Sequence, residues 1–279
     1  MTNFVNLDQD IISWLQEDIP YWDTNSDLIL NNKHTTAKIQ VKQNGVLSGT
    51  VPFIRVFSKL GVKVVSLKSD GDKLRTGEIV FNLEGPIRDI LMGERVSLNI
   101  LSHMSGISTM TANLMNQIKN EGLTSKIAAT RKTLPGLRKY QKWAVKVGNG
   151  DTHRMSLSDM IMLKENHLSQ FSSITEALEV TMRQKSFSQK IEIEVTTNEQ
   201  ALEAARGGVD IIMLDNYNSK EISGIISEIR KINQGILIEV SGNITEANFM
   251  DFARKGIDII SMGKLTHSSV ALDFSLLVD

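Results

Sequence analysis

Basic side chains able to bind an anion gather in one part of the chain, and three of them directly follow apolar, strand-like runs. Arg131 and Lys132 end the run at residues 126–130, and Lys164 follows the run at residues 160–163. Arginine binds carboxylate or phosphate through paired hydrogen bonds, and lysine supplies a point charge. Residues placed just after a strand favour binding over simple solvation. We therefore predict that the ligand is an anion.

The other cations of this region have a different interpretation. A solvated helix face is the usual role of a basic run, and we assign it to Arg138, Lys139 and Lys142. His153 stands beside Arg154 after a polar loop, which favours ligand contact, whereas His167 is interpreted as a structural residue. No spacing in the chain matches a zinc site, a nucleophile elbow or a Walker loop.

Carboxylates occupy comparable positions on later strand-like runs. Glu192 and Glu194 alternate with isoleucines, so both point to one side of their strand, and Asp215 ends the next run. Such groups can bind ribose hydroxyls, hold a hydrated magnesium ion or stabilise a developing positive charge. Each alone could instead balance a lysine. Their occurrence at neighbouring strand ends favours a functional site.

Two glycine-containing segments follow the last two runs. Ser241-Gly242-Asn243 precedes a helix expected near Thr245, and Gly263 opens the segment after the final run. Small residues let backbone N–H groups approach a phosphate, with a helix N-terminus behind them. Glycine is also common in the turns that follow strands, so one such segment alone is weak evidence for a phosphate site. The prediction depends on finding two of them after consecutive strand-like runs. We predict a phosphate pocket there.

The second part of the chain alternates strand-like runs with helical stretches, which predicts an α/β fold with a parallel sheet. Six runs are expected, at residues 126–130, 160–163, 191–195, 211–214, 236–240 and 257–262. Polar residues follow nearly every run. An open sheet concentrates its site at one crevice, whereas a ring of polar strand ends is typical of a barrel. We therefore predict an incomplete α/β barrel of about six strands.

The first hundred residues mix both kinds of element without a repeat. Helices are predicted at residues 11–18, 52–60 and about 93–119, strands at 35–41, 62–67 and 77–83, and a polar turn at 23–27. Composition excludes some classes of function. The formal net charge of -1 gives no global field for nucleic acid or an acidic membrane. Absence of cysteine, of a secretory signal and of a long apolar run predicts a cytoplasmic protein.

Several of these segments, in this order, resemble the quinolinate phosphoribosyltransferase family. One is Ala129-Thr130-Arg131-Lys132-Thr133, followed by Pro135-Gly136-Leu137-Arg138-Lys139. The others are residues 93–99, 101–107, 150–155, 163–167, 213–216 and 265–268. The likeness runs from about residue 37 to the end of the sequence and is specific as an ordered set.

This resemblance implies two domains and a reaction. An N-terminal α/β sandwich would span residues 1–106, completed by residues 267–279, and the barrel domain would span residues 107–266. The family joins quinolinate to phosphoribosyl pyrophosphate with release of carbon dioxide and pyrophosphate, a step of NAD biosynthesis. It implies Mg²⁺ as cofactor and a homodimer in which Arg95 reaches the partner subunit's site.

The resemblance also implies the roles of individual residues. The carboxylates of quinolinate would be held by five side chains: Arg95, Arg131, His153, Arg154 and Lys164. Catalysis would involve Lys132, Lys164, Glu194 and Asp215, with magnesium held through phosphoribosyl pyrophosphate and not by direct protein ligation. The 5′-phosphate would be lined by Ser241, Gly242 and Gly263.

The chain departs from the family pattern at two glycine positions, where Asn149 and Asn243 stand instead. Asparagine tolerates positive φ better than most residues, so the backbone path is expected to survive. Near Asp23 the usual Gly-Asp-Ile-Thr-Thr pattern is largely lost. Two alternatives remain: a sister group linked to molybdate transport operons, which usually lacks the lysine at Lys164, and a non-catalytic sugar-phosphate-binding barrel, which the pair Glu194 and Asp215 disfavours.

Overall fold

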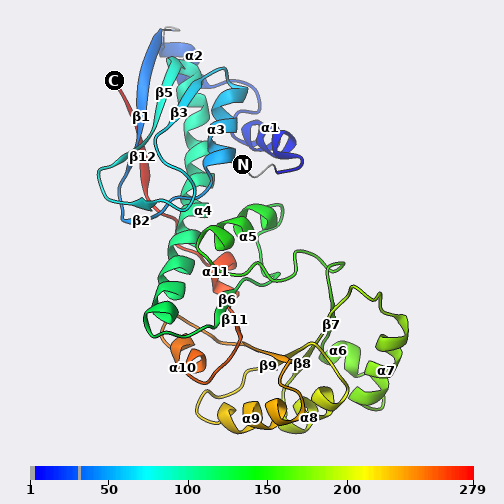
Figure 1. Ribbon diagram of the computed structural model, residues 1–279. Coiled ribbons are helices and arrows are strands. Elements are labelled where there is room, and N and C mark those ends of the chain that lie inside the picture. The colour runs from blue at the N-terminus through cyan, green and yellow to red at the C-terminus, as the bar shows by residue number, and fades with distance from the viewer. Residues whose placement is uncertain (1–3, 31–32) are drawn as a thin grey trace. The chain divides into compact units, whose positions relative to one another are not determined.

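The computed structural model describes residues 4–30 and 33–279, and the chain divides into two compact units (Figure 1). The first unit comprises residues up to 112, residues 139–149 and residues 268–279. The second comprises residues 113–138 and 150–267. The family resemblance predicts a domain boundary after residue 106, and this position lies within a long helix that continues to residue 120. Each unit is described separately below.

The first unit is built on a four-stranded antiparallel sheet in the order β12-β1-β5-β3. The strands are β1 (His34–Val41), β3 (Lys63–Ser66), β5 (Ile79–Pro86) and β12 (Phe274–Val278), with a short extra pair of β2 (Gly45–Val46) and β4 (Lys73–Leu74). In β1, Ala37, Ile39 and Val41 are buried and alternate with more exposed residues, because successive side chains of a strand point to opposite faces. The strand predicted at residues 35–41 is thus confirmed.

Helices complete the first unit and bury the inner face of its sheet. They are α1 (Leu7–Asp18), α2 (Thr24–Ile29), α3 (Thr50–Lys59), the long α4 (Ile87–Asn120) and α5 (Arg138–Val147). The core joins aromatic residues of α3 to β5: Phe53 stacks on Phe81 with ring centroids 4.2 Å apart, and Phe57 meets Phe53 edge-on at 5.1 Å. Aliphatic residues of β1 and α4 surround these rings.

The second unit contains a six-stranded parallel sheet in the order β6-β11-β10-β9-β8-β7 (Figure 1). Its strands are β6 (Lys126–Ala128), β7 (Ile161–Leu163), β8 (Ile191–Val195), β9 (Ile211–Asp215), β10 (Leu237–Ser241) and β11 (Ile259–Ser261). All six predicted runs therefore form strands, and the α/β class is confirmed. Apart from an isolated parallel bridge between Ala128 and Asp151, strand pairing in the described chain ends at β6 and β7, so closure into a barrel stays a prediction.

Helices follow the strands of this sheet in turn. They are α6 (Glu165–Leu168), α7 (Ile174–Gln184), α8 (Asn198–Arg206), α9 (Ile222–Ile232), α10 (Phe249–Ala253) and α11 (Lys264–His267). Side chains cap two of them: Ser173 accepts the N–H of Glu176 at the start of α7, and Thr197 accepts that of Gln200 at the start of α8. Burial on both faces explains the continuous apolar runs of the central strands.

Two sequence predictions were wrong in the first unit. The polar turn expected at residues 23–27 is instead the start of α2, where Asp23 is the N-cap and accepts the backbone N–H of Ser26 at 3.2 Å. Asp, Asn and Ser favour both turns and N-caps, so composition does not separate the two. The prediction that Lys142 lies on a solvated helix face was also wrong, because this residue is fully buried. Helix α5 is enclosed by other segments of this unit, to which the side chains of Tyr140 and Trp143 donate hydrogen bonds.

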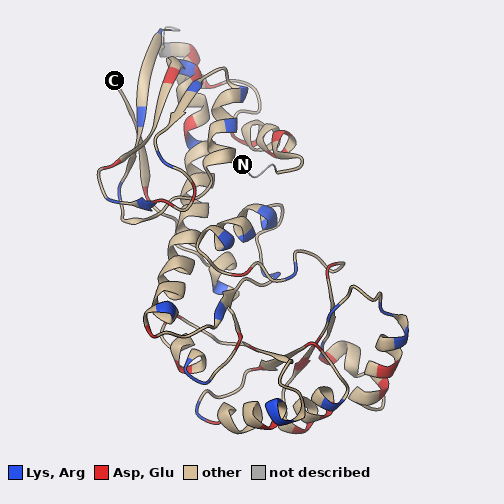
Figure 2. Ribbon diagram, viewed as in Figure 1, with Lys and Arg blue, Asp and Glu red and all other residues tan. Residues whose placement is uncertain are grey.

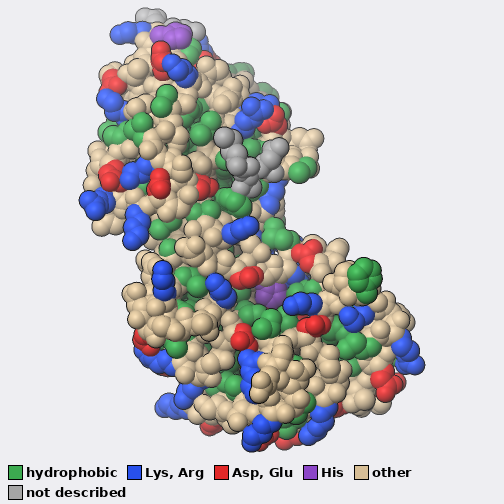
Figure 3. Space-filling model, viewed as in Figure 1, with side chains coloured by type: hydrophobic (Ala, Val, Ile, Leu, Met, Phe, Trp, Pro, Cys, Tyr) green, Lys and Arg blue, Asp and Glu red, His purple; other side chains and the backbone are tan. Residues whose placement is uncertain are grey.

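Charged and apolar side chains are both distributed over the surface of the described residues. Basic and acidic side chains are interspersed over each unit, and the exposed apolar side chains visible on this face are scattered among them (Figures 2 and 3). Within the described chain, no helix combines the length and the apolar character needed to cross a membrane.

Removal of the Phe53 side chain tests the aromatic core of the first unit. Phe53→Ala should lower the free energy of unfolding by about 3–5 kcal/mol, because the packed site cannot collapse around the lost ring. All three tryptophans (Trp14, Trp22 and Trp143) lie in this unit, so urea unfolding followed by tryptophan fluorescence reports on it. Leu28→Ala is the control, since Leu28 is 77% exposed, and it should change stability by less than about 0.5 kcal/mol. Equal effects of the two variants would contradict this account of the core.

Candidate active site

A cavity of about 630 Å³ lies in the second unit at the carboxyl ends of the parallel strands. All the sequence-predicted site residues except Arg95 line it: Arg131, Lys132, His153, Arg154, Lys164, Glu194, Asp215, Ser241, Gly242 and Gly263. Arg95 is exposed on α4 in the first unit. Parallel strands bring the residues that follow them to one edge of a sheet, which explains why positions spread over 130 residues converge.

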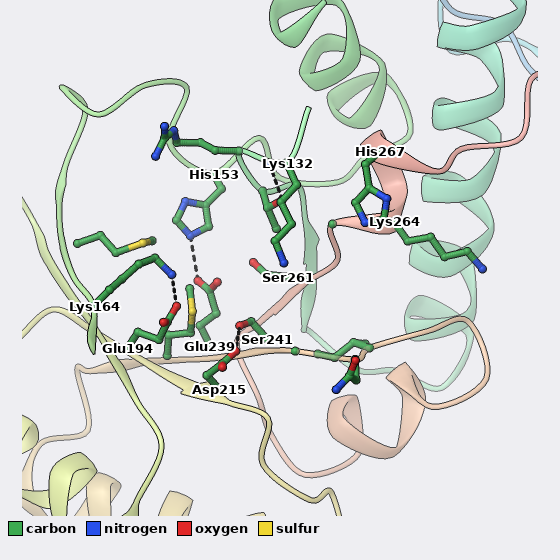
Figure 4. Close-up of a pocket in the computed structure, with 18 of the residues that line it drawn as sticks. Lys132, His153, Lys164, Glu194, Asp215, Glu239, Ser241, Ser261, Lys264 and His267 are labelled. Carbon is green, nitrogen blue, oxygen red and sulfur yellow. Dashed lines mark hydrogen bonds and ion pairs between the residues drawn. The ribbon is translucent and has the colours of Figure 1, made fainter. Parts of the chain in front are cut away.

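The pairing of β7 with β8 creates an ion pair at the cavity wall. Met162 is opposite Glu192 in this register, so Lys164 and Glu194, two residues further along each strand, also lie side by side. The ammonium group of Lys164 contacts the carboxylate of Glu194 (Figure 4). Both side chains are partly exposed to the cavity, which leaves each of them accessible to a ligand.

The next pair of strands fixes the second carboxylate. Asp215 of β9 is opposite Ser241 of β10, and the hydroxyl of Ser241 donates to Asp215 Oδ1 at 2.6 Å (Figure 4). The other oxygen, Oδ2, accepts the side-chain amide of Asn216 at 2.7 Å, and Asn216 in turn accepts the amide of Asn243 at 3.1 Å. Donors on both oxygens hold the carboxylate in one orientation toward the cavity.

Glycine is required where the late strands meet the cavity. Gly242 has a φ of +84°, and an added Cβ would lie 2.2 Å from Oδ1 of Asn216. At Gly263 a Cβ would come within 3.0 Å of the Lys132 side chain. Asn149 and Asn243, the two departures from the family pattern, have φ of 67° and 50°. Both asparagines thus adopt a positive φ, as is expected of residues that stand in place of glycines.

One detail of the predicted phosphate pocket was wrong. The helix expected near Thr245 begins only at Phe249, after a turn in which the Asn248 side chain accepts the backbone N–H of Thr245. A helix does follow Gly263 directly, and its Thr266 hydroxyl donates to the backbone oxygen of Lys132 at 2.7 Å. This bond ties the segment after β6 to the segment after β11.

Two arginines create an excess of positive charge beside these groups. Nε of Arg131 is buried, and no hydrogen-bond partner is found for it among the described residues. Burial, and then the positive charge of Arg131, lower the pKa of Arg154. A pKa lowered by a neighbouring cation means that the two charges repel each other. An anionic ligand would relieve this repulsion, as the strand-end position of the arginines predicts.

His153 contacts a pair of acidic residues at the floor of the cavity. Its Nε2 lies 3.1 Å from Oε2 of Glu239 and 3.4 Å from Oε2 of Glu192, and both carboxylates are fully buried (Figure 4 labels His153 and Glu239). Burial of the ring would lower the pKa of His153, but the two carboxylates raise it to about 10. Burial also raises the pKa of Glu192.

Sequence reasoning missed some cavity residues, chiefly Glu239, Ser261 and His267. The signal for Glu239 was present, because it alternates with apolar residues in β10 and shares the face of Ser241. His167 was interpreted correctly as structural: its Nδ1 accepts the backbone N–H of Lys164 at 3.0 Å and caps α6.

Comparison with family models gives matches over nearly the whole chain. The model of the quinolinate phosphoribosyl transferase C-terminal domain matches residues 107–277, and the model of the N-terminal domain of the same family matches residues 23–105. The two matches meet within α4. They cover both units and every residue of the cavity described above.

Individual proteins are similar over comparable lengths. A probable nicotinate-nucleotide pyrophosphorylase [carboxylating] of Archaeoglobus fulgidus is 40% identical over 93% of this chain and 99% of that protein. The nicotinate-nucleotide pyrophosphorylase [carboxylating] of Dictyostelium discoideum is 38% identical over 95% of this chain and 93% of that protein. Among solved structures, NadC from Streptococcus pyogenes superposes with a TM-score of 0.92 at 37% identity, covering 99% of this chain and 98% of that one.

Substitution of Gly242 tests the close approach of β10 to Asn216. Gly242→Ala should destabilise the second unit by about 1–3 kcal/mol, because the new methyl group occupies the place of the Asn216 side chain at a positive φ. Gly224→Ala is the matched control: Gly224 lies in α9 with nothing within 4 Å of an added Cβ, so it should stabilise by about 0.5–1 kcal/mol. Thermal unfolding by circular dichroism measures both. An unchanged melting temperature for Gly242→Ala would contradict the geometry.

Proposed function

Because the chain belongs to the quinolinate phosphoribosyltransferase family, we propose that it joins quinolinate to phosphoribosyl pyrophosphate. The products are nicotinate mononucleotide, carbon dioxide and pyrophosphate, a step of NAD biosynthesis. The observation that carries this proposal is the cavity in which two carboxylates at adjacent strand ends, Glu194 and Asp215, face a set of arginines and lysines. Such a site suits an anionic acceptor and a sugar that becomes positively charged.

Quinolinate carries two carboxylates, and the cations of the cavity offer a partner for each. Arg131, Arg154 and Lys164 bind them, with Arg95 supplied by the partner subunit of a homodimer. His153, which was also expected to bind quinolinate, contacts Glu239 through Nε2 instead. Support comes from the buried, unpartnered Nε of Arg131 and from its repulsion of Arg154, both of which a dianion relieves. A ligand with a single carboxylate would leave part of this positive charge without a counter-ion.

Glu194 and Asp215 serve the phosphoribosyl donor. The bond between C1 of the ribose and pyrophosphate breaks, the leaving group keeps the electron pair, and the ring nitrogen of quinolinate forms the new bond to C1. Positive charge develops on the sugar as the bond breaks, so nearby carboxylates stabilise the transition state. The new ring cation then accepts the electrons of the C2 carboxylate bond as carbon dioxide leaves, and C2 takes up a proton.

Lys132 and Lys164 balance charge during the same step. Lys132 faces the phosphates of the donor, and Lys164 neutralises Glu194 while it contacts quinolinate. Ser241, Gly242 and Gly263 line the 5′-phosphate pocket, because an absent or small side chain lets backbone N–H groups reach phosphate oxygens. The steric limits at Gly242 and Gly263 support this assignment.

Mg²⁺ is proposed to enter with the pyrophosphate group and to lie near Glu194 and Asp215 without direct protein ligation. The donor set fits this ion, because hard carboxylate oxygens are its preferred protein partners and it keeps several waters. Both carboxylates already accept hydrogen bonds or an ion pair from protein groups, which favours contact through water. When bound, the ion neutralises charge on the leaving pyrophosphate.

Three further features stay proposals: closure of the parallel sheet as an incomplete barrel, assembly as a homodimer and a cytoplasmic location. The alternatives considered from the sequence are not favoured. Relatives that are 38–40% identical over at least 93% of the chain carry the name nicotinate-nucleotide pyrophosphorylase [carboxylating], which favours the transferase over a sister-group protein of molybdate transport operons and over a non-catalytic sugar-phosphate-binding barrel. Lys164 and its pairing with Glu194 also favour the transferase.

An assay with competing pyridines tests the function. Purified protein with phosphoribosyl pyrophosphate and Mg²⁺ should release pyrophosphate with quinolinate and at least about 10²-fold more slowly with nicotinate, because a missing carboxylate leaves buried cations unpaired. Each pyrophosphate released with quinolinate should be accompanied by one molecule of carbon dioxide. Equal rates with nicotinate would refute the assignment of the cations, and binding without turnover would favour a non-catalytic protein.

Asp215→Asn tests charge stabilisation at the sugar. The variant should lose on the order of 10²–10³ in kcat, with kcat/KM falling in parallel and quinolinate affinity little changed. Asp251→Asn, at an exposed carboxylate in α10, is the control and should retain full activity. Steady-state kinetics combined with a thermal melt distinguishes charge stabilisation at the sugar from a purely structural role of Asp215. A normal kcat with reduced stability would make Asp215 a structural residue only.

A further inference from the structure

Two buried glutamates lie under the cavity and have no part in the function proposed above. Glu192 on β8 and Glu239 on β10 have side chains with 0% exposure. Transfer of a carboxylate from water into a protein interior is unfavourable unless hydrogen bonds or an opposite charge compensate it. The structure should therefore contain a group that stabilises this pair.

That group is the imidazole of His153. Its Nε2 hydrogen-bonds to Oε2 of Glu239 at 3.1 Å and lies 3.4 Å from Oε2 of Glu192. Neither oxygen of Glu192, nor Oε1 of Glu239, has another hydrogen-bond partner in the described part of the chain. His153 is thus the main polar contact between the acidic pair and the rest of the site.

The other ring nitrogen fixes the tautomer. Nδ1 accepts the backbone N–H of Arg154 at 2.7 Å, so in this geometry Nδ1 has no hydrogen and Nε2–H donates to Glu239. The two carboxylates raise the pKa of His153 and favour a protonated ring, whereas the hydrogen bond accepted by Nδ1 favours the neutral ring with its hydrogen on Nε2.

The backbone at His153 shows what this anchoring achieves. His153 has a φ of 50°, which is uncommon for a residue other than glycine, and its N–H donates to Oδ1 of Asp151 at 2.6 Å. A residue in this conformation is strained and persists only when its surroundings fix it. Bonds at the backbone and at both ring nitrogens do so here, and the next residue of the turn is Arg154.

We propose that Glu192 and Glu239 are positioning residues: they hold the His153 ring from below, and the ring fixes the turn that directs Arg154 into the cavity. This inference rests on the proposed function, in which Arg154 binds a carboxylate of quinolinate. Both side chains are fully buried, and we assign them no contact with substrate. They act on quinolinate affinity through His153, and their effect on the phosphoribosyl donor is small.

A double-mutant cycle tests this inference. Glu239→Met keeps the side-chain volume but removes the acceptor, so it should raise the KM for quinolinate by roughly 10-fold to 10²-fold, the usual effect of a small misplacement. The KM for phosphoribosyl pyrophosphate should change little. Glu239→Gln retains an acceptor oxygen and should restore most of the quinolinate affinity. In a His153→Ala background, Glu239→Met should add almost nothing, because both act through one contact.

Controls separate positioning from a structural role. Glu121→Gln disrupts an exposed ion pair with Arg254 in the same unit and should leave both KM values unchanged. Long-range proton–nitrogen NMR spectra should show Nε2 of His153 protonated in the wild type and a mixture of tautomers in Glu239→Met. Glu192→Met repeats the kinetic test at the second carboxylate if Glu239→Met does not fold.

Three results would overturn the inference. The first is an equal rise of both KM values together with a lower melting temperature, which indicates structural damage. The second is full additivity of Glu239→Met and His153→Ala in their effects on the KM for quinolinate. The third is one equivalent of a transition metal in the purified wild type that is lost in Glu239→Met, which would make the cluster a metal site. A wild type that neither binds nor turns over quinolinate would instead remove the proposed function, and this inference with it.

Discussion

The parallel register of strands β7 to β10 is the constraint on which the active site depends. Each strand contributes one residue at its carboxyl end and one residue two positions earlier on the same face. Lys164 is level with Glu194, which pairs with Met213 of β9, and Asp215 and Ser241 form a further pair two residues beyond Met213. Glu192 and Glu239 lie two residues before Glu194 and Ser241 on the same faces. A shift of one strand by a single residue would turn its polar residues away from the cavity. The apolar residues between them, buried on the opposite face, make that shift unfavourable.

Charge balance within the cavity follows from this arrangement. The strand-end groups pair one lysine with one glutamate and fix one aspartate through neutral donors, so together they keep one formal negative charge. The cations in excess, Arg131 and Arg154, come from segments outside strands β7 to β10. The sheet thus supplies the groups that face the sugar, and the segments around it supply those that bind the acidic acceptor. Substitutions of the arginines in these segments therefore leave the register of the strands unchanged.

The sequence indicates much of this plan, for physical reasons that also mark its limits. Strand-end positions of Arg131, Lys164, Glu194 and Asp215 are readable because apolar runs end sharply there. Lys142 was misassigned because charge alone does not reveal that other segments enclose α5. The helix at residue 24 was taken for a turn because caps and turns use the same residues. Glu239 was overlooked because its importance depends on a histidine 86 residues away, a contact that only the tertiary fold creates.

The pairing of β12 with β1 has a consequence for synthesis of the protein. Residues 274–278 complete a sheet whose other strands all lie before residue 87. While a ribosome is still making the second unit, one edge of β1 exposes unpaired backbone groups and part of the first core lacks Phe274 and Leu272. Such an edge can pair with another chain. The unit that is translated first is therefore completed only after the second unit has been synthesised, and for that interval its open edge remains able to pair with another chain.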